Sequence, residues 1–267
     1  MRLASFRRRD DPSGSVLGGE IRDEMVVAFD GGEGVLDRLR SGDRRPATGP
    51  AFPLAEVELR MPHAPPVLYG VGRNYAAHAA ELGNEPPGEP LVFTMPPTAA
   101  GHPDDPVSRG RLTARLDYEA ELAVVLGTLA DGAVGVAGYA VADDVSARDL
   151  QASEEQWTRA KGSDGWCPFG PWITTVDEVP DPHALRIRSW VDGEPRQDAS
   201  TADMVFRVPR IVDHLRAAIT LRPGDLVLTG TPAGVGHGLR PPRYLEPGQV
   251  VRVEIEGLGA IQHAIAP

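Results

Sequence analysis

Three acidic residues, Asp117, Glu119 and Glu121, alternate with apolar residues in one short segment of the sequence. Successive side chains of a β-strand point to opposite faces, so a strand here would carry all three carboxylates on one face. The segment becomes apolar on both faces over residues 122–126, which indicates that it enters a buried sheet. Carboxylates this close together repel one another near a buried strand unless a cation compensates them. Two of them could bind one hard divalent cation if a third oxygen ligand joined them.

A second acidic segment, residues 143–149, follows the next predicted strand along the chain. Asp143 and Asp144 stand where that apolar strand ends, so this segment offers candidates for the missing oxygen ligand. Ordinary structural roles remain open for both segments at this point. The first could be the solvated edge of a half-exposed strand. The second could cap a following helix, with Arg148 paired to an acid at helical spacing.

The overall composition excludes several classes of protein. The chain has 267 residues with 27 basic and 38 acidic side chains, a net charge of −11 that is opposite in sign to that of a typical nucleic-acid binder. No apolar run approaches the ~18 residues of a membrane span, and the basic N-terminus lacks the apolar stretch of a secretory signal. The single cysteine, Cys167, excludes an intrachain disulfide and a cysteine-based zinc site. We therefore expect a cytoplasmic protein with no nucleic-acid or membrane partner.

The elements that must position the acidic residues are mainly strands. The sequence contains 30 Gly and 26 Pro, placed between short apolar runs, which favours a β-rich fold with many tight turns. Strands are predicted at residues 67–71, 116–127, 134–142, 185–191, 226–229 and 250–256. Asp192-Gly193 suits the two-residue turn of a hairpin. Helices are predicted at residues 75–82, with Asn74 as the N-cap, and at residues 209–219.

The chain resembles the fumarylacetoacetate hydrolase family in segments that follow the family's order from about residue 67 to the C-terminus. Each segment is weak alone, and their combination is highly specific. The segments are Gly72-Arg-Asn-Tyr-Ala-Ala-His78-Ala-Ala-Glu81-Leu, Asp117-Tyr-Glu-Ala-Glu-Leu122, Asp144-Val-Ser-Ala-Arg-Asp-Leu-Gln151, Lys161-Gly-Ser-Asp164, Pro168-Phe-Gly-Pro-Trp172, residues 197–206, and a stretch from Pro223-Gly-Asp to Thr229-Gly-Thr-Pro-Ala-Gly-Val-Gly236. The resemblance implies an α+β, predominantly β fold. It implies a mixed β-roll catalytic domain at residues 63–267, a small N-terminal domain at residues 1–62, and a homodimer.

The resemblance also implies a Mg²⁺ or Mn²⁺ site. Carried over position by position, the ligands are Glu119, Glu121 and Asp144. Ligation by oxygen alone suits these hard cations rather than zinc, which agrees with the acidic spacing described above. Asp143 stands where the family usually has Asn before the metal-binding aspartate, and this change leaves the set of ligands intact.

His78 and Glu81 are three residues apart, so on a helix they share a face. Without the family, an ordinary surface ion pair explains them equally well. The resemblance implies instead that His78 is a general base that deprotonates water, oriented by Glu81, on a lid segment that orders over the substrate. It further implies that Lys161 stabilises negative charge on the substrate. The implied substrate-binding residues are Arg73, Gln151 and Thr231.

One further departure concerns the far end of the substrate. Family members commonly carry Phe-x-Lys-Pro after the lid, whereas this chain has Phe93-Thr-Met95-Pro96, so a cation is missing. The contacts to the distal part of the substrate are therefore expected to differ from those of the family, and no specific substrate is carried over.

These inferences lead to one expected activity and two alternatives. We expect a divalent-metal-dependent hydrolase that cleaves a C–C bond in a small 2-oxo or 2,4-dioxo acid, of the acylpyruvate or fumarylacetoacetate type, through a metal-bound enolate. The first alternative is an oxaloacetate-type decarboxylase or a 2-hydroxy-dienoate isomerase, neither of which needs a water nucleophile. The second is a family member that binds a ligand without turnover.

Overall fold

Two long apolar segments pair to form the centre of the fold. β11 (Ala120–Thr128) and β12 (Val134–Asp143) run antiparallel, with Ala120 opposite Asp143. Nearly every residue of both strands is buried, as expected for strands that are covered on both faces of a sheet. The computed structural model describes residues 1–267 of the protein.

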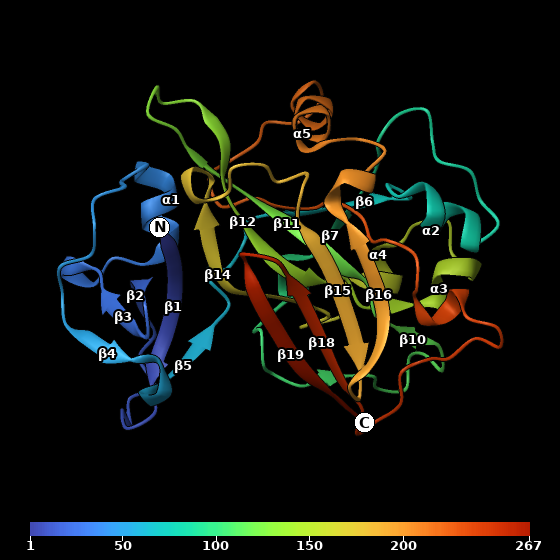
Figure 1. Cartoon of the computed structure of the whole chain (residues 1–267), viewed down its shortest axis with the longest axis horizontal. Helices are drawn as coiled ribbons and strands as arrows, with labels where there is room; N and C mark the ends of the chain where they lie inside the picture. The colour runs from blue at the N-terminus through green and yellow to red at the C-terminus, as the bar shows by residue number, and fades with distance from the viewer.

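This hairpin lies in the middle of a large sheet of twelve strands (Figure 1). The strand order is β4 (Ala51–Pro53), β3 (Met25–Ala28), β2 (Leu17–Arg22), β1 (Arg2–Arg8), β14 (Cys167–Thr175), β12, β11, β17 (Leu226–Leu228), β6 (Leu68–Gly72) and β7 (Leu91–Met95), while β5 (Val57–Arg60) pairs with β1 and β8 (Ala100–Gly101) with β14. β17 and β6 are parallel neighbours, so this side of the sheet brings the residues after β17 next to those after β6.

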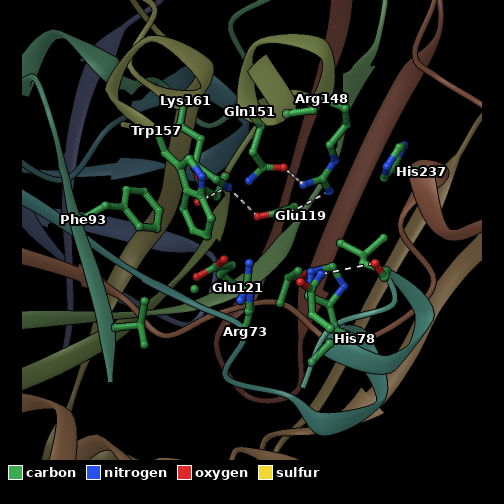
Figure 2. Close-up of a pocket in the computed structure, with 18 residues that line it drawn as sticks. Arg73, His78, Phe93, Glu119, Glu121, Arg148, Gln151, Trp157, Lys161 and His237 are labelled. Carbon is green, nitrogen blue, oxygen red and sulfur yellow. Dashed lines mark hydrogen bonds and ion pairs between the residues drawn. The ribbon is translucent and has the colours of Figure 1, made fainter. Parts of the chain in front are cut away.

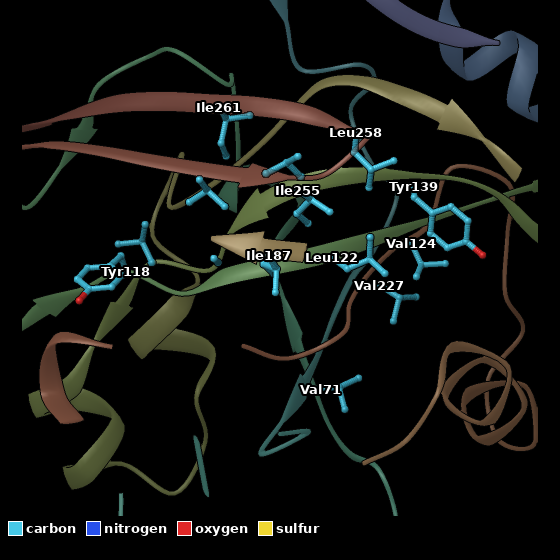
Figure 3. Close-up of a cluster of buried hydrophobic side chains, with 14 of the residues drawn as sticks. Val71, Tyr118, Leu122, Val124, Tyr139, Ile187, Val227, Ile255, Leu258 and Ile261 are labelled. Carbon is cyan, nitrogen blue, oxygen red and sulfur yellow. The ribbon is translucent and has the colours of Figure 1, made fainter. Parts of the chain in front are cut away.

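A second sheet packs on the large one. Its order is β16 (Glu194–Ser200), β15 (Arg186–Val191), β18 (Val250–Ile255), β19 (Gly259–Ala266) and β9 (Val107–Ser108). Val191 lies opposite Glu194, so Asp192-Gly193 forms the predicted two-residue turn between β15 and β16. Apolar side chains of both sheets meet in one buried cluster (Figure 3), to which β11 contributes Leu122, β15 contributes Ile187 and β19 contributes Ile261. Burial of each such side chain contributes about 1.5–3 kcal/mol.

Strands β1–β5 form the N-terminal part of the chain, seen in blue at one side of Figure 1. They join the large sheet through β1, whose Arg2 lies opposite Thr174 of β14. They also share a small apolar cluster of their own that includes Phe6 and Val26. The predicted α+β fold, with strands predominating, is confirmed. A separate domain at residues 1–62 stays a prediction.

The helices are few and short. They are α1 (Val35–Ser41), α2 (Ala76–Glu81), α3 (Arg148–Ser153), α4 (Thr158–Lys161) and α5 (Val208–Arg216). None of them is long and apolar enough to cross a membrane. The predicted cap of α2 is wrong, because Tyr75 is the N-cap residue and no side chain caps the helix. Asn74 instead donates hydrogen bonds to the carbonyl oxygens of Phe206 and Thr229, which ties the start of α2 to the rest of the fold.

The predicted strand over residues 116–127 is interrupted. Leu116 and Asp117 form β10, which pairs with β13 (Ser146–Ala147) in a separate two-stranded sheet, and β11 begins only at Ala120. The alternation that would place Asp117 on the same face as Glu119 therefore fails. Because Asp117 and its partners are buried and polar, the chain leaves the regular sheet here to satisfy them.

Candidate active site

A pocket opens beside α2, α3 and α4, where β6 and β12 end and β11 begins (Figure 2). Most of the residues predicted for the site line this pocket. They are Arg73, His78, Glu119, Glu121, Asp144, Gln151, Lys161 and Thr231. The remaining one, Glu81, is hydrogen-bonded to His78. The fold thus brings together residues that span more than half of the sequence, and their roles stay predictions.

The acidic group in the pocket consists of Glu119, Glu121 and Asp144, whose carboxylates offer oxygen atoms that all lie within 4.8 Å of one another. All three residues are buried, so an exposed acidic strand edge is wrong as an interpretation of this segment. The pairing of β11 with β12 creates the group, because Asp144 follows β12 directly and its backbone N–H donates to the carbonyl oxygen of Glu119 at 2.9 Å.

Two buried cations lie against these acids. The Nζ atom of Lys161 donates to Glu119 at 2.6 Å, to Asp144 at 2.6 Å and to the hydroxyl of Ser146 at 2.8 Å. All three protons of this ammonium group therefore have acceptors within the protein. Arg148 forms ion pairs with Glu119 at 2.7 Å and with Asp117 at 2.8 Å. Lys161 in this arrangement supplies positive charge to the acids rather than a free hydrogen-bond donor.

One carboxylate in the group has no such cation. Glu121 accepts a hydrogen bond from the backbone N–H of Gly230 at 2.6 Å and forms no ion pair. Burial and the neighbouring charges of Asp144 and Glu119 raise the pKa of Glu121 well above its ordinary value. Burial also raises the pKa of Asp144, to about 6, although Lys161 opposes this change. With all three carboxyl groups ionised, the group would carry more negative charge than Lys161 and Arg148 compensate, and for this reason Glu121 and Asp144 hold their protons more readily.

The opposite shift at Glu119 has a clear cause. Burial alone would raise the pKa of this carboxyl group, but Lys161 and Arg148 outweigh burial and lower the pKa to about 2. Glu119 is therefore ionised across the physiological range. In addition, the Oδ1 atom of Asp144 is buried without a hydrogen-bond partner. An ionised carboxylate, an unpartnered oxygen and a third acid fit a hard divalent cation.

His78 and Glu81 form a second functional unit on α2. The Nδ1 atom of His78 lies 2.8 Å from Oε1 of Glu81, and Oε2 of Glu81 accepts the backbone N–H of Gly234 at 3.0 Å. A carboxylate only accepts hydrogen bonds, so in the neutral imidazole the proton lies on Nδ1 and Nε2 keeps its lone pair. This tautomer suits a general base in the pocket that His78 lines.

The predicted substrate-binding residues differ in how many of their side-chain hydrogen-bonding groups are already paired within the protein. Arg73 lines the pocket, has a backbone φ of 58°, and its side chain forms no hydrogen bond or ion pair with the chain. Its guanidinium is free to bind a carboxylate. The side-chain oxygen of Gln151 accepts from Arg148, which leaves its NH₂ group free. The hydroxyl of Thr231 already donates to Ala120 and accepts from Gln197.

Several pocket residues were not predicted from the sequence. For Arg148 the sequence left open an ion pair with an acid at helical spacing, but Arg148 is buried between Asp117 and Glu119. Phe93 and Trp157 form an edge-to-face aromatic pair with ring centres 5.3 Å apart on one wall of the pocket (Figure 2). Neither aromatic residue carries a spacing signal in the sequence. Val145, Ala147 and Leu150 near Arg148 are apolar, which was a usable sign of its burial.

Met95, where the family commonly has Lys, is buried in an apolar cluster on the large sheet. It lies opposite Leu68 of β6 and does not line the pocket. The side chain at this position therefore contributes apolar packing in the core and no charge. Arg73 is the pocket cation without a protein partner.

Comparisons with known proteins agree with this architecture. Residues 67–266 match the family model for the fumarylacetoacetate (FAA) hydrolase C-terminal region. Oxaloacetate tautomerase YisK of Bacillus subtilis (strain 168) is 38% identical over 225 residues, which cover 80% of this chain and 75% of that protein. Fumarylacetoacetate hydrolase of Exiguobacterium antarcticum superposes with a TM-score of 0.87 at 35% identity, covering 100% of this chain and 99% of the other.

A third similar protein has another named reaction. The 2-hydroxyhepta-2,4-diene-1,7-dioate isomerase of Mycobacterium marinum superposes with a TM-score of 0.79 at 34% identity, covering 100% of this chain and 98% of the other. The named relatives are thus enzymes of three kinds, a hydrolase, an isomerase and a tautomerase, that share one fold.

Proposed function

The chain belongs to the fumarylacetoacetate hydrolase family, and from this premise we propose that it is a metal-dependent hydrolase that cleaves a C–C bond in a 2,4-dioxo acid. The observation that carries this proposal is the His78–Glu81 pair in the same pocket as the acidic group. Hydrolysis needs an activated water, and a histidine with a free Nε2 can provide it. The homodimer, the cytoplasmic location and the separate domain at residues 1–62 are part of the same proposal.

Glu119, Glu121 and Asp144 would hold a Mg²⁺ or Mn²⁺ ion, which when bound supplies a Lewis acid for the oxygen atoms of a 2-oxo carboxylate. The chain's own residues have separate tasks. Arg73 and the NH₂ group of Gln151 bind and orient the substrate carboxylate.

The proton transfer is assigned to α2. Nε2 of His78 takes a proton from water, and the carboxylate of Glu81 stabilises the resulting imidazolium through Nδ1. The hydrogen bond from Gly234 to Glu81 fixes the carboxylate during this transfer. Lys161 keeps Glu119 and Asp144 oriented toward the pocket and adds positive charge next to the substrate.

A second candidate function rests on the named relatives. The tautomerase and the isomerase rearrange a substrate without breaking it by hydrolysis, and both share this fold. An oxaloacetate-type decarboxylase belongs to the same alternative. A family member that binds a ligand without turnover is the remaining one, and the complete set of acidic and basic pocket residues argues against it.

The direct test is a substrate screen in the presence of Mg²⁺ or Mn²⁺. We expect acylpyruvates to be cleaved to pyruvate and a carboxylic acid, with the products identified by NMR. Oxaloacetate is the comparison substrate, because its keto–enol exchange or decarboxylation would reveal the second candidate function. Exchange or CO₂ release without any cleavage of acylpyruvates would contradict hydrolysis.

Metal removal is expected to destabilise the protein. A chelator would leave Glu119, Glu121 and Asp144 repelling one another, so it should lower the melting temperature, and added Mn²⁺ should restore it. The folded-state pKa of Asp144 is raised from 3.8 to about 6, so the metal-free fold loses stability as pH rises through this window. The chelator effect should therefore be larger at pH 8 than at pH 5. A melting temperature that the chelator leaves unchanged at both pH values would contradict the proposed metal site.

A further inference from the structure

A buried polar pair connects the last strand of the second sheet to the acidic group. The Oδ2 atom of Asp143, at the end of β12, lies 2.8 Å from Nε2 of His263 on β19. The exposed fraction is 0% for Asp143 and 1% for His263. Neither residue lines the pocket.

The other oxygen of Asp143 reaches the acidic group directly. Its Oδ1 atom accepts the backbone N–H of Glu119 at 2.7 Å. Glu119 lies in the interruption between β10 and β11, where its N–H has no strand partner. Its carbonyl oxygen accepts the N–H of Asp144 at 2.9 Å. The side chain of Asp143 and the backbone of Asp144 thus hold the backbone of Glu119 at both its N–H and its carbonyl oxygen.

We propose that Asp143 and His263 are positioning residues, which fix the backbone of Glu119 so that its carboxylate meets those of Glu121 and Asp144 at the distance a divalent cation requires. This inference rests on the proposed metal-binding function of the three acids. Groups that orient metal ligands from outside the coordination sphere commonly affect metal affinity by about 10- to 100-fold.

The two residues act as a matched pair. A carboxylate only accepts hydrogen bonds, so Asp143 needs a donor on each oxygen, and His263 supplies the second one. An asparagine at position 143 would keep an acceptor for Glu119 but would present its NH₂ group to His263. Residue 263 would then have to accept, which His263 could do only with its proton on Nδ1, a buried atom that has no acceptor. Glutamine at position 263 can do either, because its amide carries both a donor and an acceptor at a reach similar to that of Nε2.

The test measures Mn²⁺ binding by electron paramagnetic resonance titration of the full chain without substrate. We expect His263→Leu to weaken Mn²⁺ binding by about 10- to 100-fold, and His263→Gln to bind close to the unmodified protein. Asp143→Asn should weaken binding, and adding His263→Gln to it should restore affinity. A purely structural role would lower the melting temperature of these variants without this pattern of loss and rescue in Mn²⁺ affinity.

Asp225→Asn is the matched control. Asp225 is also fully buried and accepts a backbone N–H, from Arg222 at 2.8 Å, but it does not line the pocket. This control should keep its Mn²⁺ affinity, because its hydrogen bond runs to Arg222 and not to the acidic group. Should His263→Leu fail to fold, the Mn²⁺ affinities of Asp143→Asn and of the variant that combines Asp143→Asn with His263→Gln test the positioning role. Equal affinity in all variants would overturn the positioning role alone, whereas an unmodified chain that binds no Mn²⁺ would overturn the metal function as well.

Discussion

Glu121→Gln is expected to abolish most metal-dependent turnover while raising the melting temperature of the metal-free protein. Burial, together with the neighbouring acids Asp144 and Glu119, raises the pKa of Glu121 well above the ordinary value. A neutral amide removes this repulsion, so the metal-free fold gains stability. The same change removes one of the three proposed ligands. Because a metal ion stabilises a transition state by several kcal/mol, turnover should fall by about 100-fold or more.

The two effects have opposite signs, and this separates the prediction from ordinary damage to the fold. Thermal melts in chelator and steady-state assays with saturating Mg²⁺ measure them. Glu20→Gln is the matched control, since Glu20 is also buried but pairs with Arg22 and the backbone N–H of Ala47, away from the pocket. The control should lose stability and keep its turnover. A Glu121→Gln protein that melts lower without metal, or that keeps full activity, would show that the acids do not form a strained metal site.

His78→Ala is expected to separate hydrolysis from the reactions of the named relatives. Removing a positioned general base commonly lowers a rate by about 10²- to 10⁴-fold. Cleavage of an acylpyruvate should fall by that amount, because water loses the base that His78 and Glu81 provide. Keto–enol exchange of oxaloacetate needs a base for the C3 proton but no water nucleophile, so any exchange that the protein catalyses through a base other than His78 should change much less. Both rates are measured on one preparation, by pyruvate release and by ultraviolet absorbance of the enol.

Two companion measurements make this result specific. Mn²⁺ affinity should be unchanged in His78→Ala, because His78 is not among the three acids that would bind the ion. Glu81→Gln should lower cleavage less than His78→Ala does, since it removes the stabilising charge and leaves the base. Undiminished acylpyruvate cleavage by His78→Ala would exclude water activation by this residue.

Local patterns in the sequence were sufficient for many elements of the fold. Alternating or continuous apolar residues predicted the strands at residues 134–142 and 185–191, and Asp192-Gly193 predicted the hairpin turn. Each depends on residues close together in the chain, where side-chain period and turn geometry dominate. The cap of α2 could not be predicted in this way. Asn74 had a suitable side chain, but distant carbonyl oxygens of Phe206 and Thr229 compete for it.

The chain alone carried the types of the three acids, the spacing of His78 and Glu81, and the signs of the fold class. Which charges meet could be known only from the folded chain. It removed Asp117 from the acidic group, buried Arg148 and Lys161 against it, and brought His263 to Asp143 from the last strand. The physical reason is that alternation fixes only the face on which a side chain lies. Its partners across the pocket depend on strand pairing and on the packing of the two sheets, which join residues far apart in the chain.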